Sequence, residues 1–145
     1  MTEPSDTEPL DALWGAYRAT TYTARFPTAV VRIRVGAACA GLDGELADRN
    51  LTTWAYITAA NPDSVPLSDD QNAGRHQALL RAVETLRWPC FSGEGVPDDP
   101  SWAPEKSLLV LGIPQPQAIE LGQRFDQRAI LWGTLGGLPE LVACR

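Results

Sequence analysis

Residues 52–62 read Thr-Thr-Trp-Ala-Tyr-Ile-Thr-Ala-Ala-Asn-Pro, and this stretch decides the fold that the sequence predicts. Its first part, through Ala59, is rich in β-branched and aromatic side chains, which favours a strand inside a sheet. Asn61 and Pro62 then end the strand, because the residue before a proline avoids helical backbone angles. We therefore expect a central strand, then a loop, then a helix.

Three helices are predicted around this strand, over about residues 10–19, 69–87 and 116–125. Ser68 and Gln71 have the spacing of a capping box, which indicates the start of the long helix. Pro116 suits the first turn of the third helix, where a missing N–H group costs nothing. The first helix is short, and its leucine and aromatic side chains recur at helical spacing.

Five further strands are predicted, over about residues 28–35, 88–91, 107–113, 129–134 and 138–144. The first of them alternates apolar residues with arginines, a period typical of a half-buried strand. Gly136 and Gly137 indicate a hairpin turn before the last strand. Residues 36–50 and 92–104 contain glycines or prolines and are predicted to be loops.

These elements predict an α+β fold with a single domain over residues 10–145. The expected sheet is mostly antiparallel and has about five to six strands. Two main helices cover one of its faces, and the short N-terminal helix precedes it. A mixed sheet, with parallel pairs across the helices, is the alternative.

Composition excludes several classes of protein. The chain has 145 residues and a formal net charge of −6, which fits one domain and disfavours nucleic acid as a partner. Its three cysteines are far apart and it has one histidine, so neither a disulfide framework nor a metal site is expected. No apolar run is long enough to span a membrane. Residues 1–9 are expected to form a flexible acidic tail without a signal segment, which predicts a cytoplasmic protein.

The junction between the central strand and the long helix offers free backbone N–H groups and several polar side chains. The candidate residues there are Thr58, Asn61, Asn72, Arg75 and His76. Together they would suit a small anionic or carbonyl-bearing ligand. Structural roles are the alternatives: Asn61 closing a turn, His76 in the core, and Arg75 on the surface.

Two residues farther along the chain are candidates to close the same site. Glu105 precedes a buried strand, where a carboxylate beside Arg75 or His76 could act as a base or orient one. Gln127 follows the third helix and could point across the sheet. The alternatives are an exposed loop acid and a glutamine that satisfies carbonyl groups at the helix end. Cys90 is expected to be an inert thiol, because nothing in the spacing brings it to a histidine.

Four segments carry a family resemblance: residues 54–62, 72–75, 102–113 and 121–130. In this order and spacing they resemble the DUF3293 family of small bacterial proteins of unknown function, over about residues 20–145. The resemblance implies that Asn61, Asn72, Arg75, Glu105 and Gln127 are the positions to test. Asp126 stands where the family pattern has a glycine, and aspartate tolerates left-handed backbone better than most residues. The family brings no established activity or cofactor.

The function is thus open between two hypotheses. The first is a small-ligand-binding or catalytic pocket at the junction around residues 58–76, taking a small anionic or polar ligand. The second is a non-catalytic interaction module, either a homo-oligomer or a subunit of a larger assembly. An exposed edge strand or apolar patch would favour the second. The sequence indicates no cofactor and no reaction.

Overall fold

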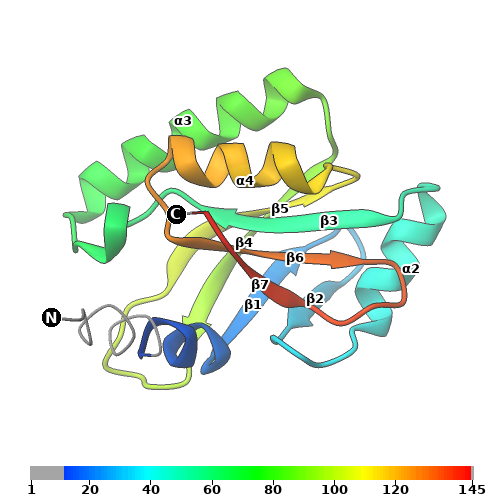
Figure 1. Ribbon diagram of the computed structural model, residues 1–145, viewed down its shortest axis with the longest axis horizontal. Helices are drawn as coiled ribbons and strands as arrows, with labels where there is room; N and C mark the ends of the chain where they lie inside the picture. Colours follow the sequence, from blue (N-terminus) through cyan, green and yellow to red (C-terminus); the bar gives the residue numbers. More distant parts are fainter. Residues whose placement is uncertain (1–11, 145) are drawn as a thin grey trace, which may run out of the picture.

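Strand β3 (Thr53–Thr58) lies inside the sheet, where its apolar side chains on both faces are buried. In the computed structural model, which describes residues 12–144, β3 pairs with β5 (Glu105–Leu111) and with β6 (Ala129–Thr134), one on each side (Figure 1). Thr58 lies opposite Ser107, so the end of β3 is beside the start of β5. The interior strand predicted from the sequence is confirmed.

The sheet has seven strands in the order β2-β1-β4-β5-β3-β6-β7, and each described pairing is antiparallel. The other strands are β1 (Thr20–Arg25), β2 (Val30–Ile33), β4 (Cys90–Pro97) and β7 (Glu140–Ala143). The α+β class and the antiparallel sheet are confirmed. The predicted count of five to six strands is too low, and the described strands do not form the mixed alternative.

The strand count differs because the prediction lacks β1, and the strand predicted at 88–91 is shorter than β4, which continues to Pro97. The prediction gives no strand at residues 20–25 and a loop over 92–104, yet β1 and β4 pair with each other. Glycine allows this pairing: a Cβ at Gly93 would collide with the backbone of Thr23. Glycine is thus required there by the close approach of another strand rather than by a turn.

Helices α3 (Asp69–Leu86) and α4 (Gln115–Arg124) match the two main predicted helices, and a 3₁₀ turn, η1 (Pro62–Ser64), precedes α3. The Ser68 and Gln71 side chains each accept a hydrogen bond from the other's backbone N–H at 3.1 Å, which confirms the capping box. Residues 12–18 are helical, whereas the tail predicted over 1–9 lies outside the described residues. Within residues 12–144, no helix is long and apolar enough to cross a membrane.

Helix α2 (Ala40–Asp48) contradicts the loop predicted over residues 36–50. Gly41 and Gly44 weaken the local helical signal, since glycine costs about 1 kcal/mol relative to alanine inside a helix. Leu42 and Leu46 are fully buried against the sheet. Packing therefore stabilises a helix that local propensity does not predict.

Two hydrophobic cores lie on opposite faces of the sheet. Helices α3 and α4 cover one face, above β3 in the view of Figure 1. The sheet curls toward its other face, and its two edges approach there: the Gly36 N–H, after β2, donates to the Pro139 carbonyl oxygen, before β7, at 2.9 Å. We call the space inside this curl the half-barrel. Helix α2, Tyr22 and Tyr56 pack within it.

Substituting Gly93 with alanine is expected to cost about 3 kcal/mol or more, because the new Cβ would collide with the backbone of Thr23. The matched control is Gly44→Ala in α2, where a Cβ would meet no atom within 4 Å. This variant is expected to be about 0.5–1 kcal/mol more stable than the parent. Urea unfolding measures both, and a small effect at Gly93 would contradict the close packing of β1 on β4.

Candidate functional site

The site predicted from the sequence centres on Asn61, whose side chain joins three parts of the chain. Its Nδ2 donates to Glu105 Oε2 at 2.7 Å. Its Oδ1 accepts from the Leu67 N–H at 3.0 Å and from Asn72 Nδ2 at 2.9 Å. Asn72 Oδ1 in return accepts from the Asn61 N–H at 2.9 Å. One asparagine thus ties the chain after β3 to the first turn of α3 and to the start of β5.

Arg75 and Gln127 bind carbonyl oxygens of the neighbouring loops. Arg75 Nε donates to the Ala59 oxygen at 2.6 Å, and its Nη2 donates to the Phe125 oxygen at 2.5 Å. Gln127 Nε2 donates to the oxygens of Ala60 and Phe125 at 3.0 and 3.2 Å. These bonds satisfy backbone groups and fasten the loop after β3 to the loop after α4.

The loop after β3 and the loop after α4 both contain non-glycine residues with left-handed backbone. Asn61, Asp63 and Ser64 have φ angles of 48°, 51° and 64°, and Asp126 has a φ angle of 60°. The Asp63 N–H donates to the Asp126 carbonyl oxygen at 2.7 Å, which joins the two left-handed segments. Such backbone costs roughly 1 kcal/mol or more per residue and persists where surrounding contacts impose it. Asp126 therefore adopts a conformation that glycine reaches without strain.

Glu105 is half-buried at the start of β5, so it is not the exposed loop acid of the alternative interpretation. Burial raises the pKa of its carboxyl group above the ordinary value, and the hydrogen bond from Asn61 opposes this rise. No ion pair within residues 12–144 includes Glu105, because Arg75 instead lies 3.7 Å from Asp126 Oδ2. Among the described residues the carboxyl group therefore has a hydrogen-bond donor but no ion-pair partner.

Thr58 and His76 occupy different positions relative to this network. Thr58 Oγ1 donates to the Lys106 carbonyl oxygen at 2.7 Å and accepts from the Ala60 N–H at 3.1 Å. His76 Nδ1 is buried and has no hydrogen-bond partner among residues 12–144. Burial, followed by the nearby Lys106, lowers the pKa of His76, so its ring is neutral at pH 7. His76 is thus beside the network without being part of it.

We define the junction cluster as the residues that these contacts join: Thr58, Asn61, Asn72, Arg75, Glu105 and Gln127. The sequence prediction that these side chains lie close together agrees with this geometry. Most of their polar atoms contact the backbone or one another, as the structural interpretation of Asn61 expects. Glu105 accepts one side-chain hydrogen bond among the described residues, fewer than a carboxylate can accept.

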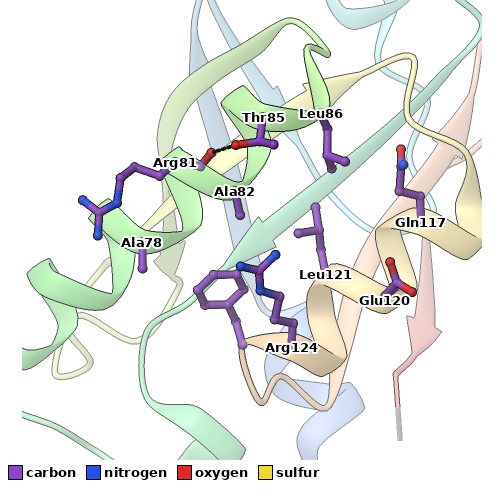
Figure 2. Close-up of a pocket in the computed structure, with 10 residues that line it drawn as sticks. Ala78, Arg81, Ala82, Thr85, Leu86, Gln117, Glu120, Leu121 and Arg124 are labelled. Carbon is purple, nitrogen blue, oxygen red and sulfur yellow. Dashed lines mark hydrogen bonds between the residues drawn. The ribbon is translucent and has the colours of Figure 1, made fainter.

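A groove of about 470 Å³ between α3 and α4 was not predicted from the sequence (Figure 2). Apolar side chains from both helices form its floor, and Arg81, Glu120 and Arg124 are among the polar residues that border it. The signal that could have indicated it is the pair Ala78 and Ala82, whose small side chains leave room between the helices. The groove is a second place where a partner could bind.

Metal-ligand clusters and cysteine thiols are two further groups that could carry chemistry. No group of three His, Cys, Asp or Glu side chains within residues 12–144 is placed to hold a metal ion. Burial, followed by the charge of Glu84, raises the pKa of the Cys90 thiol. The unreactive thiol form therefore predominates at pH 7.

Comparison with known proteins gives one match. The family model for DUF3293, described as a protein of unknown function, matches residues 57–130, about half of the chain. No curated protein and no solved structure matches the chain. The matched region runs from the end of β3 to the start of β6 and includes every residue of the junction cluster.

Replacing Asn61 with alanine is expected to destabilise the protein by about 2 kcal/mol, because it removes three side-chain hydrogen bonds and leaves alanine at positive φ. Asn61→Gly is the matched control, since glycine adopts the left-handed conformation without strain. The difference between the two variants separates the backbone effect from the side-chain effect. Urea unfolding at pH 7 measures both, and losses below about 0.5 kcal/mol in both would show that the network does not hold the loop.

Glu105→Gln keeps an acceptor for Asn61 and removes the charge. Because the folded-state pKa is raised, the contribution of Glu105 to stability is present below its unfolded pKa and is lost as the pH rises through its folded pKa. We expect E105Q to match the parent at about pH 4 and to be more stable than the parent at pH 7. Urea unfolding at the two pH values checks this. A variant that is less stable than the parent at pH 7 would show that the carboxylate supports the fold.

Proposed function

This chain belongs to the DUF3293 family, described as proteins of unknown function, and we propose that its junction cluster binds or transforms a small polar ligand that contacts Glu105. The observation that carries the proposal is the half-buried carboxyl group held at 2.7 Å by the Asn61 amide. Glutamate is seldom buried without a partner of opposite charge, and perturbed acids are frequent at functional sites.

The other members of the cluster position this carboxyl group. Asn61 donates to it directly, and Asn72 holds Asn61 through two hydrogen bonds of 2.9 Å. Arg75 and Gln127 fix the neighbouring loops through carbonyl oxygens. A functional group must be held by supporting residues whose own conformations are fixed, and this arrangement has that character.

Strain in the backbone supports the same location. Four non-glycine residues with positive φ lie in the two loops that meet at the cluster, and one hydrogen bond of 2.7 Å links them. Left-handed backbone is concentrated at binding and catalytic sites, because it fixes groups in positions that relaxed loops do not reach.

The chemistry available to Glu105 is proton transfer or hydrogen bonding. A carboxyl group whose pKa is raised by burial can accept or donate a proton nearer to neutral pH than an exposed one. His76, neutral and half-buried on α3, remains a candidate at the border of the site. The proposal therefore covers both a binding site and a general acid–base site.

The alternative is a protein-interaction module, and the groove between α3 and α4 favours it. Exposed Val65 and Trp102 add apolar surface elsewhere on the molecule. The family match does not discriminate between a ligand site and an interaction module, because the groove also lies within residues 57–130. The half-buried acid, which an interaction module would not require, makes the ligand site our first choice.

A thermal-shift screen of nucleotides, amino acids and sugar phosphates tests the proposal, because a ligand that binds the native state raises its melting temperature. For a true ligand, the shift is expected to fall by at least about half in Glu105→Gln. The matched control is Glu120→Gln, an exposed acid on α4 that lines the groove. Glu120→Gln should leave the ligand-induced shift in melting temperature unchanged.

The same variants locate the site if the proposal is wrong. A shift that is lost in Glu120→Gln and retained in Glu105→Gln would place the ligand in the groove. A screen without hits, together with a mass that rises with concentration in light scattering, would favour the interaction module.

A further inference from the structure

The charge of Glu105 has no partner of opposite sign among residues 12–144. Arg75 does not supply one, because its Nε and Nη2 donate to backbone carbonyl oxygens. Lys106 does not supply one either, since adjacent residues of a strand point to opposite faces, and Lys106 acts on His76 on the α3 side. A half-buried carboxylate without a cation is costly, so this position favours a cation that comes from outside the chain.

Aromatic residues border the carboxyl group inside the half-barrel. The strand register places Tyr22 opposite Gly95 and Gly95 opposite Glu105, so the three residues form one row across β1, β4 and β5. The Tyr22 ring lies against Gly95, with ring atoms 3.4 and 3.5 Å from the position of a Cβ there. After burial, the charge of Glu105 is among the causes that raise the pKa values of Tyr17 and Tyr22, so both phenols are near it. The exposed Arg128 also acts on Tyr17, in the opposite direction, but within residues 12–144 it forms no ion pair with Glu105.

The two phenols do not donate to the acid. Tyr17 donates to the Ala129 carbonyl oxygen at 3.4 Å, and Tyr22 donates to the Tyr17 carbonyl oxygen at 2.9 Å. Their hydroxyl groups therefore have other acceptors, and the Asn61 amide remains the donor to Glu105. A carboxylate bordered by aromatic rings is an environment that recognises ammonium groups.

We infer that the ligand of the junction cluster carries a protonated primary amine, which binds Glu105 beside Tyr17 and Tyr22. The inference rests on the proposed ligand site and specifies the chemistry of its ligand. The ammonium group donates to the carboxyl oxygen that Asn61 does not use, and the aromatic rings add cation–π attraction. An anion would instead meet the charge of Glu105, while Arg75 is already bonded to the backbone. This inference keeps the polar ligand of the sequence expectation but replaces the anionic ligand with a cationic one.

Three probes of matched length separate charge from size: propylammonium, 1-propanol and propionate. Each is titrated to about 50 mM into ¹⁵N-labelled protein at constant ionic strength and about pH 7, which covers millimolar dissociation constants. We expect propylammonium to shift the backbone amides of Asn61, Glu105 and Tyr22 saturably, and to bind about tenfold or more tightly than 1-propanol.

Glu105→Gln is expected to weaken propylammonium binding about tenfold, whereas Asp48→Asn, an exposed acid on α2, should leave it unchanged. Two results would overturn the inference and leave the ligand site standing. One is tighter binding of propionate at the same amides, and the other is propylammonium binding that survives Glu105→Gln. The absence of saturable shifts with all the probes would also overturn the inference, and the ligand screen would then decide the site separately.

Discussion

The hydrogen bonds of Asn61 are the constraint on which the loop after β3 and the carboxyl group of Glu105 both depend. Its backbone is left-handed, which turns the chain back toward α3, and its side-chain amide spans from Leu67 to Glu105. Asparagine suits this position because it adopts positive φ more readily than most residues and carries both a donor and an acceptor. Without that amide, Glu105 would lose the one side-chain donor that it has among the described residues.

The fold places this network at one end of the sheet, where residues from both faces take part in it. Helices α3 and α4 cover one face, while the curled face forms the half-barrel. Asn72 and Arg75 reach the network from the helical face, and Glu105 lies on the face of the half-barrel with Tyr22. The end of the sheet therefore combines a rigid set of supporting bonds with one acid that lacks a cation. This separation of supporting and contacting residues is what makes a ligand site the better hypothesis.

Much of this arrangement follows from local sequence signals. The strand at 52–59, the capping box of α3 and the grouping of Asn61 with Asn72 could be predicted, because each depends on residues close in the chain. Helix α2 could not be predicted, because its stability comes from the packing of Leu42 and Leu46 against strands that are distant in the chain. This packing outweighs the cost of the glycines in the helix. The pairing of β1 with β4 could not be predicted either. In the sequence Gly93 indicates a loop, and only the structure shows that the close backbone of Thr23 requires glycine there. The raised pKa of Glu105 could not be predicted, because it depends on burial, which the spacing of residues along the chain does not show.

Glu105 is half-buried and has no ion-pair partner among the described residues, and a carbon-detected NMR titration of its side-chain carboxyl group measures the effect of this environment on its pKa. We expect the titration midpoint of Glu105 to lie clearly above the ordinary glutamate pKa of about 4.3, because burial disfavours the charged form more than the Asn61 amide favours it. A midpoint at or below that value would show that the carboxylate is well hydrated or already paired. The structure would then offer no reason for an external cation to bind there.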